Sequence, residues 1–327
     1  MNNPQPTNGN PQLAGLLLVL LAAALWGTLG TLYKFGTDTF GLTPLTIVFW
    51  RAALAGLVLA LVLGIVMPLF GKGWSSLRVR RADLPIFITF GLLGVTAFYL
   101  LYIYAVVLVG VAVAVVLLYT APAFVSVMSW RFLGESFGPR KMLALLLTLL
   151  GCALVARVYD PTLLRLNVVG ILCGVGSAFT YALYSILGKL SLRRGYPIAT
   201  MSFYVYTIGA IGLLLVALFG AGASGVEQLF SMGTDVGAWA LLLLLAVAQT
   251  IGALYAYTAG LRHLEAGTAS ILATFEPLVA ACLAYFLLHE TLEWLQLVGG
   301  ALILVAVMLL QSNRMSSGSV TLPVVEP

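Results

Sequence analysis

Charged residues are scarce in this sequence, because only 8% of its 327 residues are Asp, Glu, Lys or Arg. A soluble domain of ordinary composition carries about 25%, so the scarcity excludes a cytosolic enzyme and a disordered chain. The three cysteines, Cys152, Cys173 and Cys282, lie in apolar stretches without the paired spacing of a motif. They exclude a secreted disulfide scaffold and are expected to be small buried hydrophobic residues.

Residues that carry chemistry are also few. The only two histidines, His263 and His289, are expected near helix ends, and the sequence has no GxSxG, HExxH or GxxxxGK[ST] motif. We therefore expect no catalytic residues, metal site or cofactor, and no ATPase partner is required. An intramembrane enzyme acting on lipid is the weaker alternative. The net charge of +5 comes without a basic stripe, so no nucleic-acid partner is expected.

Long hydrophobic runs dominate the chain, in which 61% of the residues are hydrophobic. A helix that crosses a bilayer needs roughly 20 apolar residues, and in lipid it must satisfy its own backbone hydrogen bonds. A barrel would show short alternating strands instead. The sequence therefore predicts an all-α membrane protein with ten transmembrane helices, at about 13–33, 45–66, 84–104, 107–130, 141–158, 168–188, 198–220, 237–260, 266–288 and 295–311.

Basic residues are distributed unevenly over the expected loops. With the N-terminus inside, twelve of the 16 Lys and Arg residues fall on the cytoplasmic side, and only Lys34, Arg51, Arg157 and Arg165 fall outside. Such an excess is typical of cytoplasmic loops. We expect both termini in the cytoplasm of a bacterial cell, a location in the inner membrane, and a disordered cytoplasmic tail at 312–327.

One offset recurs along the chain and predicts an internal repeat at 13–158 and 168–311. Five pairs of identical or similar residues are 155 positions apart: Trp26 and Tyr181, Lys34 and Lys189, Tyr102 and Tyr257, Pro122 and Pro277, and Glu135 and Glu290. Each repeat holds five of the expected helices, and because five is odd the second repeat enters the membrane from the opposite side. Inverted repeats of this kind are typical of secondary transporters. The alternatives are a repeat that only stabilises a bundle, and a channel, for which the sequence indicates no ring of charged residues.

Several segments resemble the EamA-type exporters of the drug/metabolite transporter superfamily. The first helix reads LAAALWGTLGTLYK, the second begins with Arg51 in FWRAALAG, and the fourth ends in Leu-Gly-Glu in APAFVSVMSWRFLGES. The second half repeats the last pattern in FEPLVAACLAYFLLHET, where His289 replaces the Gly. The resemblance covers about residues 13–311 and implies ten helices, cytoplasmic termini and a central substrate cavity. Within the superfamily, the chain looks most similar to the aromatic amino-acid exporters, although Arg51 has Tyr206 as its counterpart.

Glu276 is the one carboxylate expected well inside a span, and its counterpart in the first half is Ala121. An ionisable group near the bilayer centre costs about 2.5–3.5 kcal/mol, so Glu276 must face a hydrated or protein interior or be protonated. It is a candidate for contact with a substrate amine or for proton binding. The alternative is a protonated carboxyl that bonds to a neighbouring helix.

Two prolines, Pro122 and Pro277, are expected in the middle of helices. Each removes a backbone donor and frees the carbonyl four residues earlier, which belongs to Leu118 or Ala273. Matched bends in two helices suit a gate, so both prolines are candidate gating residues. They can equally be plain kinks.

Aromatic and polar residues near span centres are expected to line a substrate pocket, which is mostly apolar with a few polar groups. These candidates are Trp26, Thr28, Thr96, Tyr99, Tyr119, Tyr181, Tyr184 and Gln249.

Other aromatic and basic residues are expected nearer the membrane surface. Tyr102 and Tyr257 fit the interfacial aromatic belt, and Lys34, Arg51 and Lys189 are expected to reach toward the interface. Alternatively, Arg51 holds a substrate carboxylate at the external mouth.

Together these features predict a secondary transporter that moves small amphipathic metabolites, above all aromatic or neutral amino acids, out of the cell by alternating access. Transport is expected to be a uniport or linked to protons. A multidrug or lipid-like solute exporter of the same fold is the alternative.

Overall fold

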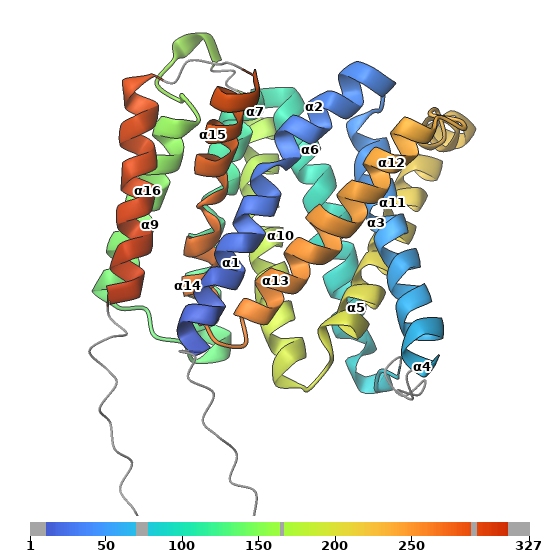
Figure 1. Cartoon of the computed structure of the whole chain (residues 1–327), viewed down its shortest axis with the longest axis horizontal. Helices are drawn as coiled ribbons and strands as arrows, with labels where there is room; N and C mark the ends of the chain where they lie inside the picture. Colours follow the sequence, from blue (N-terminus) through green and yellow to red (C-terminus); the bar gives the residue numbers. More distant parts are fainter. Residues whose placement is uncertain (1–10, 70–77, 164–166, 289–292, 313–327) are drawn as a thin grey trace, which may run out of the picture.

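The computed structural model describes residues 11–69, 78–163, 167–288 and 293–312, and within these ranges the chain forms helices and no strand (Figure 1). Eight helical segments are long and apolar enough to cross a membrane. They are Pro11–Phe40, Pro44–Leu69, Arg81–Val109, Val111–Leu133, Val168–Arg193, Ile198–Leu229, Val236–Gly260 and Ala266–Leu283. The prediction of an all-α membrane protein is confirmed.

Several of these segments consist of more than one helix. In chain order the α-helices are α1 (Pro11–Gly27), α2 (Leu29–Phe40), α3 (Pro44–Leu61), α4 (Met67–Leu69), α5 (Leu84–Gly91), α6 (Phe98–Val109), α7 (Val111–Leu118), α8 (Ala121–Met128), α9 (Pro139–Val155), α10 (Val168–Arg193), α11 (Ile198–Leu229), α12 (Val236–Leu244), α13 (Ala253–Gly260), α14 (Ala266–Ala273), α15 (Glu276–Leu288) and α16 (Trp294–Ser312). The π-helical segments are η1 (Val62–Val66), η4 (Leu92–Ala97), η5 (Ser129–Leu133) and η7 (Leu245–Gly252).

Each of the ten expected segments is helical, but α9 has only 17 residues, and the last helix is apolar over the short range Trp294–Leu310. The count of ten spans therefore stays a prediction. Several expected boundaries were wrong by a few residues or more. The first segment continues beyond residue 33 to Phe40, because Gly41 with a φ of +64° is the residue that ends the helix. Of the expected tail at 312–327, Ser312 still belongs to α16, and the rest lies outside the described residues.

The first helices of the two halves run antiparallel. A Cβ atom at Gly15, near the start of α1, would lie 3.1 Å from Leu264. Lys189, near the end of α10, donates to the carbonyl oxygen of the same Leu264 over 2.5 Å. The start of α1 and the end of α10 therefore share one side of the molecule, the lower side in Figure 1, where α16 also ends.

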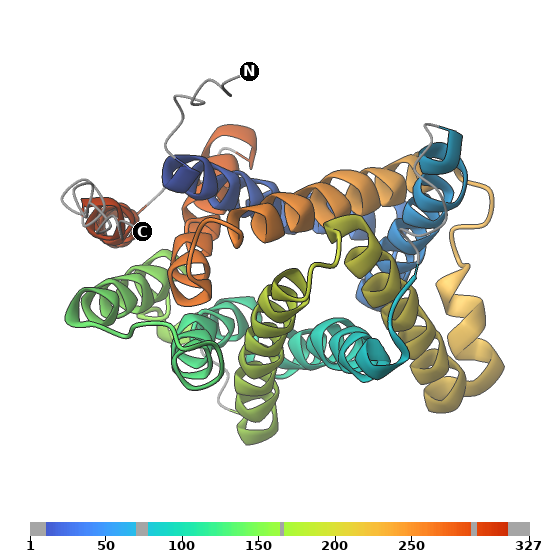
Figure 2. The same ribbon diagram turned by 90° about the horizontal axis from the view of Figure 1, so that it is seen from below.

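Close helix contacts depend on small residues. The helices α9 and α16 lie at one edge of the bundle (Figure 2), where a Cβ atom at Gly151 would lie 2.7 Å from the carbonyl oxygen of Gly299. A Cβ atom at Gly260 of α13 would lie 2.9 Å from the carbonyl oxygen of Gly15 in α1. Lipid supplies no hydrophobic force between helices, so close packing through small residues holds such a bundle together.

A buried carboxylate joins the two halves at the lower side. Glu135, which is 6% exposed, accepts hydrogen bonds from the backbone N–H groups of Ala266 at 2.9 Å and Gly267 at 3.3 Å. These groups begin α14, so the carboxylate lies at the positive end of that helix. The first half thereby caps a helix of the second half.

Lys189 binds the preceding end of the same connection. Its Nζ donates to the carbonyl oxygens of Leu261 and Leu264, which follow α13. Lys141 of α9 forms an ion pair with Glu265 in this connection. Lys189 thus binds carbonyls that a helix end leaves without intrahelical partners, and its expected reach toward the membrane interface stays a prediction.

We predict that E135A lowers the free energy of unfolding by about 1–3 kcal/mol, because two buried N–H groups lose their acceptor. The melting temperature of the purified protein in detergent measures this. E227A, at an exposed position of α11, is the control and should change little. Equal melting temperatures of E135A and the wild-type protein would contradict the capping role.

Candidate functional site

Two helices are interrupted at equivalent positions of the two halves. The gap between α7 and α8 is Tyr119–Thr120, and the gap between α14 and α15 is the pair 155 residues later, Thr274–Phe275. Pro122 and Pro277 are the second residues of the helices that follow. Proline is well tolerated in the first turn, because its missing N–H would have no partner within the helix there.

The prolines lie inside the spans Val111–Leu133 and Ala266–Leu283, as expected, and each starts a new helix after a two-residue break. Interior proline both removes a hydrogen bond and clashes with the preceding turn. Threonine hydroxyls bond to carbonyls next to both gaps: Thr120 Oγ1 donates to Leu117 O over 2.6 Å, and Thr274 Oγ1 donates to Ile271 O over 2.5 Å. Each of these carbonyls also accepts the backbone N–H of the same threonine, so the hydroxyl adds a second bond to the last turn before the gap.

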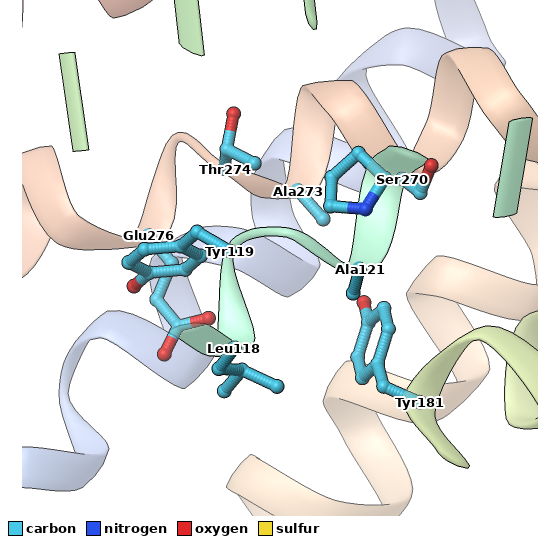
Figure 3. Close-up of a pocket in the computed structure, with 9 residues that line it drawn as sticks. Leu118, Tyr119, Ala121, Tyr181, Ser270, Ala273, Thr274 and Glu276 are labelled. Carbon is cyan, nitrogen blue, oxygen red and sulfur yellow. The ribbon is translucent and has the colours of Figure 1, made fainter. Parts of the chain in front are cut away.

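A pocket lies between the two interruptions (Figure 3). The empty space between its lining residues is about 300 Å³, a figure that includes solvent at the open side. It is lined by Leu118, Tyr119, Ala121, Pro122, Tyr181, Ser270, Ala273, Thr274 and Glu276. Three pairs of these residues are 155 positions apart: Leu118 and Ala273, Tyr119 and Thr274, and Ala121 and Glu276. The two halves thus contribute equivalent positions to one pocket.

Glu276 is the charged residue of this pocket. It is the first residue of α15, where the helix dipole favours a negative group. In Figure 3 its carboxyl group lies beside the ring of Tyr119, and the two groups are close enough to interact electrostatically. Its counterpart Ala121 adds no polar atom to the wall. The pocket therefore combines one acidic group with apolar and hydroxyl-bearing surface.

Aromatic rings extend the pocket wall. The ring centroid of Tyr181 lies 6.5 Å from that of Trp26 and 6.2 Å from that of Tyr184. Trp26 in turn lies 5.5 Å from the ring of Tyr257, whose hydroxyl is 3.0 Å from Ser185 Oγ. Tyr257 is fully buried, so its expected place in the interfacial belt was wrong: its hydroxyl finds a partner inside the protein.

A second polar group surrounds Arg51, which was expected at a span end but is only 5% exposed within α3. Its Nε donates to Thr250 Oγ1 over 3.0 Å, and its Nη1 donates to the hydroxyl of Tyr33 over 2.5 Å. The guanidinium carbon lies 5.6 Å from the ring centroid of Tyr33 and 5.4 Å from that of Tyr99. Cation–π contacts and hydrogen bonds inside the bundle thus replace the interfacial water.

Two π-helical segments each contain a threonine that bonds back to its own helix. The segment η4 shifted by 155 residues falls within η7. In each, a threonine donates to the carbonyl five residues earlier: Thr96 to Gly91 over 3.5 Å, and Thr250 to Leu245 over 2.8 Å. Thr96 also donates to Gly209 of α11 over 3.0 Å. Its hydroxyl therefore serves helix packing, whereas Thr250 reaches Arg51.

A hydrogen bond between Thr28 and Gln249 connects the first membrane-spanning segment with η7. Gln249 Nε2 donates to Thr28 Oγ1 over 2.9 Å, at the point where α1 gives way to α2. Gln249 directly precedes Thr250, the partner of Arg51.

The structure thus divides the predicted site residues into groups. Those that line the pocket are Tyr119, Pro122, Tyr181 and Glu276. Thr96 packs against α11, and Pro277 follows Glu276. The others lie behind the pocket wall or near Arg51: Trp26, Thr28, Tyr99, Tyr184 and Gln249. The sequence interpretation missed Ser270, Thr274 and Tyr33. The repeat offset from Tyr119 leads to Thr274, whereas no pattern in the sequence singles out the other two.

Known proteins resemble this chain over most of its length. An uncharacterized transporter of Archaeoglobus fulgidus is 30% identical over 90% of this chain and 95% of its own. The uncharacterized transporter YwfM of Bacillus subtilis is 27% identical over 90% and 93%, and the pseudopaline exporter CntI of Pseudomonas aeruginosa is 24% identical over 92% and 97%. A crystal structure that covers 94% of this chain and 99% of its own matches with a TM-score of 0.72 at 18% identity, which speaks for the fold alone.

The profile of the EamA-like transporter family matches the chain twice, at residues 13–157 and 168–312. Each match contains one of the two interrupted helices that form the pocket. Similarity to aromatic amino-acid exporters in particular stays a prediction. With both halves matched and a transporter 30% identical along nearly the whole chain, this protein belongs to the EamA-like transporter family of the drug/metabolite transporter superfamily.

Proposed function

We propose that this protein is a secondary transporter that moves small amphipathic metabolites, above all aromatic or neutral amino acids, out of the cell. The observation that carries the proposal is the pocket lined by three pairs of equivalent residues from the two halves. A site shared by two repeats opens to either side when the repeats exchange conformations. The aromatic wall suits the apolar part of such a solute, and Glu276 suits a basic group.

Alternating access in this proposal requires inverted halves, with bounds at 13–158 and 168–311. The antiparallel course of α1 and α10 supports that relation. Glu135 binds the backbone of Ala266 at the start of α14. Ala273, which lines the pocket, lies about 10 Å further along the same helix. The contacts of Glu135 therefore lie between the pocket and the lower side. In the proposed cycle they separate when that side opens.

The interruptions at Pro122 and Pro277 act as gates in this cycle, because a half-helix can move without bending its partner half. The side with Glu135 and Lys189 is assigned to the cytoplasm, along with both termini, in agreement with the excess of basic residues there. The name of CntI, an exporter, supports the outward direction, and the bacterial relatives support an inner-membrane location.

We predict that E276Q lowers transport at least about tenfold, since a hydrogen bond to a charged group contributes roughly 1.5–3 kcal/mol. Counterflow of labelled phenylalanine and leucine into liposomes that contain the purified protein measures this, beside a panel of cationic drugs. E227Q, at an exposed position, is the control. Wild-type kinetics of E276Q would remove this residue from the site, and preferred flux of the drugs would favour multidrug export.

Flux that is unchanged by a pH gradient would exclude proton coupling.

We predict that a cysteine at position 270 is reached by water, whereas one at position 258 is not. Ser270 and Thr258 are each 1% exposed, but only Ser270 lines the pocket. In a background without the three native cysteines, S270C should react with a small charged thiol reagent about tenfold faster than T258C, because the pocket opens during the cycle. Equal rates for the two variants would argue against a hydrated central site.

A further inference from the structure

Arg51 is a buried cation whose hydrogen bonds and ring contacts, within the described part of the chain, are all with neutral groups. Arginine keeps its charge in proteins, and removing a charge from water is costly unless it is compensated. The bonds to Tyr33 and Thr250 supply hydroxyl oxygens, and the rings of Tyr33 and Tyr99 supply weak electrostatic attraction. Among the described residues, no carboxylate oxygen lies within 4.0 Å of its nitrogens. Arg51 therefore has no anion in direct contact among the described residues, and the carboxylate of Glu276 acts on it only from beyond ion-pair distance.

Gln249, which directly precedes the Thr250 that binds Arg51, leaves a second polar atom unmatched. The hydroxyl of Thr28 donates its proton to Leu25 O over 2.7 Å, so it can only accept from Gln249. This fixes the amide with Nε2 toward Thr28. Within the described part of the chain, the opposite atom, Gln249 Oε1, is buried without any hydrogen-bond partner. A buried acceptor of this kind needs a donor, and Gln249 itself is only 5% exposed.

Arg51 is connected to the pocket by a continuous path of rings. The guanidinium lies over Tyr99, the ring of Tyr99 lies 5.4 Å from that of Phe98, and Phe98 lies 6.0 Å from Tyr181 in the pocket wall. Arg51 also interacts electrostatically with Glu276. A series of ring contacts therefore leads from the cation to the wall of the pocket that holds Glu276.

We propose that Arg51 binds the carboxylate of the transported solute and that Gln249 Oε1 accepts a hydrogen bond from an N–H or O–H group of the same solute. The substrates are then metabolites that carry a carboxylate. Solutes without a carboxylate, whether uncharged or cationic, are disfavoured. This inference rests on the proposed transport function and adds the substrate class. A guanidinium suits the role because its planar N–H groups match the two oxygens of a carboxylate.

The test compares solutes that differ only in the carboxylate. Binding of L-phenylalanine, L-phenylalaninamide and phenethylamine to the purified full-length protein is measured by thermal stabilisation in detergent. The leucine series of acid, amide and amine serves as a second set. The acids should bind at least about tenfold more tightly than their amides and amines, because a site built to bind a polar group rejects analogues that lack it.

Variants of Arg51 test whether this residue causes the preference for acids. R51Q should weaken binding of the acids at least about tenfold and leave the amides and amines within about twofold, so that the discrimination disappears. R51K retains the charge but not the planar geometry and should lie between. K34Q, at an exposed position of α2, is the matched control and should bind like the wild-type protein.

The wild-type comparison remains decisive even where an Arg51 variant fails to fold. Amides or amines that bind as tightly as the acids, or acids that do not bind at all, overturn the proposal. Retained discrimination in R51Q or R51K overturns it as well and leaves Arg51 as a structural clamp. Flux of amines equal to that of acids in liposomes would reject this subsite but leave transport intact. Acid-selective binding without any flux would reject transport but leave the subsite intact.

Discussion

In a bilayer every backbone N–H and C=O group must find a partner inside the protein, and this constraint organises the centre of the molecule. Two helices break at equivalent depths, because Pro122 and Pro277 cannot continue them. The breaks are tolerable only where other parts of the chain cover them. Side-chain hydroxyls bond to carbonyls next to each break, and the two gaps meet at one place. The pocket is therefore a consequence of two broken helices that shield each other.

The few buried charges follow the same logic of compensation. Glu135 takes the positive end of α14, and Lys189 takes carbonyls that follow α13, so each charge is satisfied by backbone from a neighbouring helix. Arg51 and Glu276 differ, because their surroundings are rings and hydroxyls or an open pocket. The charges that join the helices are thus matched within the protein, whereas Arg51 and Glu276 form no ion pair with any described residue.

Much of the arrangement follows from patterns in the chain. Hydrophobic runs placed the ten expected helical segments, and the offset of 155 related Trp26 to Tyr181, whose rings are in contact. The interpretation failed where distance from the end of a run was taken as a measure of exposure. Arg51 and Tyr257 lie near such ends, yet both are buried, because neighbouring helices cover them. Cover of that kind depends on how helices cross, which a single apolar run does not encode.

Composition and repetition by themselves determined that this protein is helical, lies in a membrane and consists of two related halves. Lipid allows few backbone conformations, because every backbone polar group needs a partner within the protein. A duplicated sequence keeps the spacing of its residues, so the two halves can be recognised. Only the tertiary structure decided that the prolines start new helices, that Thr274 joins Tyr119 in one pocket, and that Arg51 lies among tyrosines. Those facts arise from contacts between segments far apart in the chain, whose geometry is set by the packing of the whole bundle.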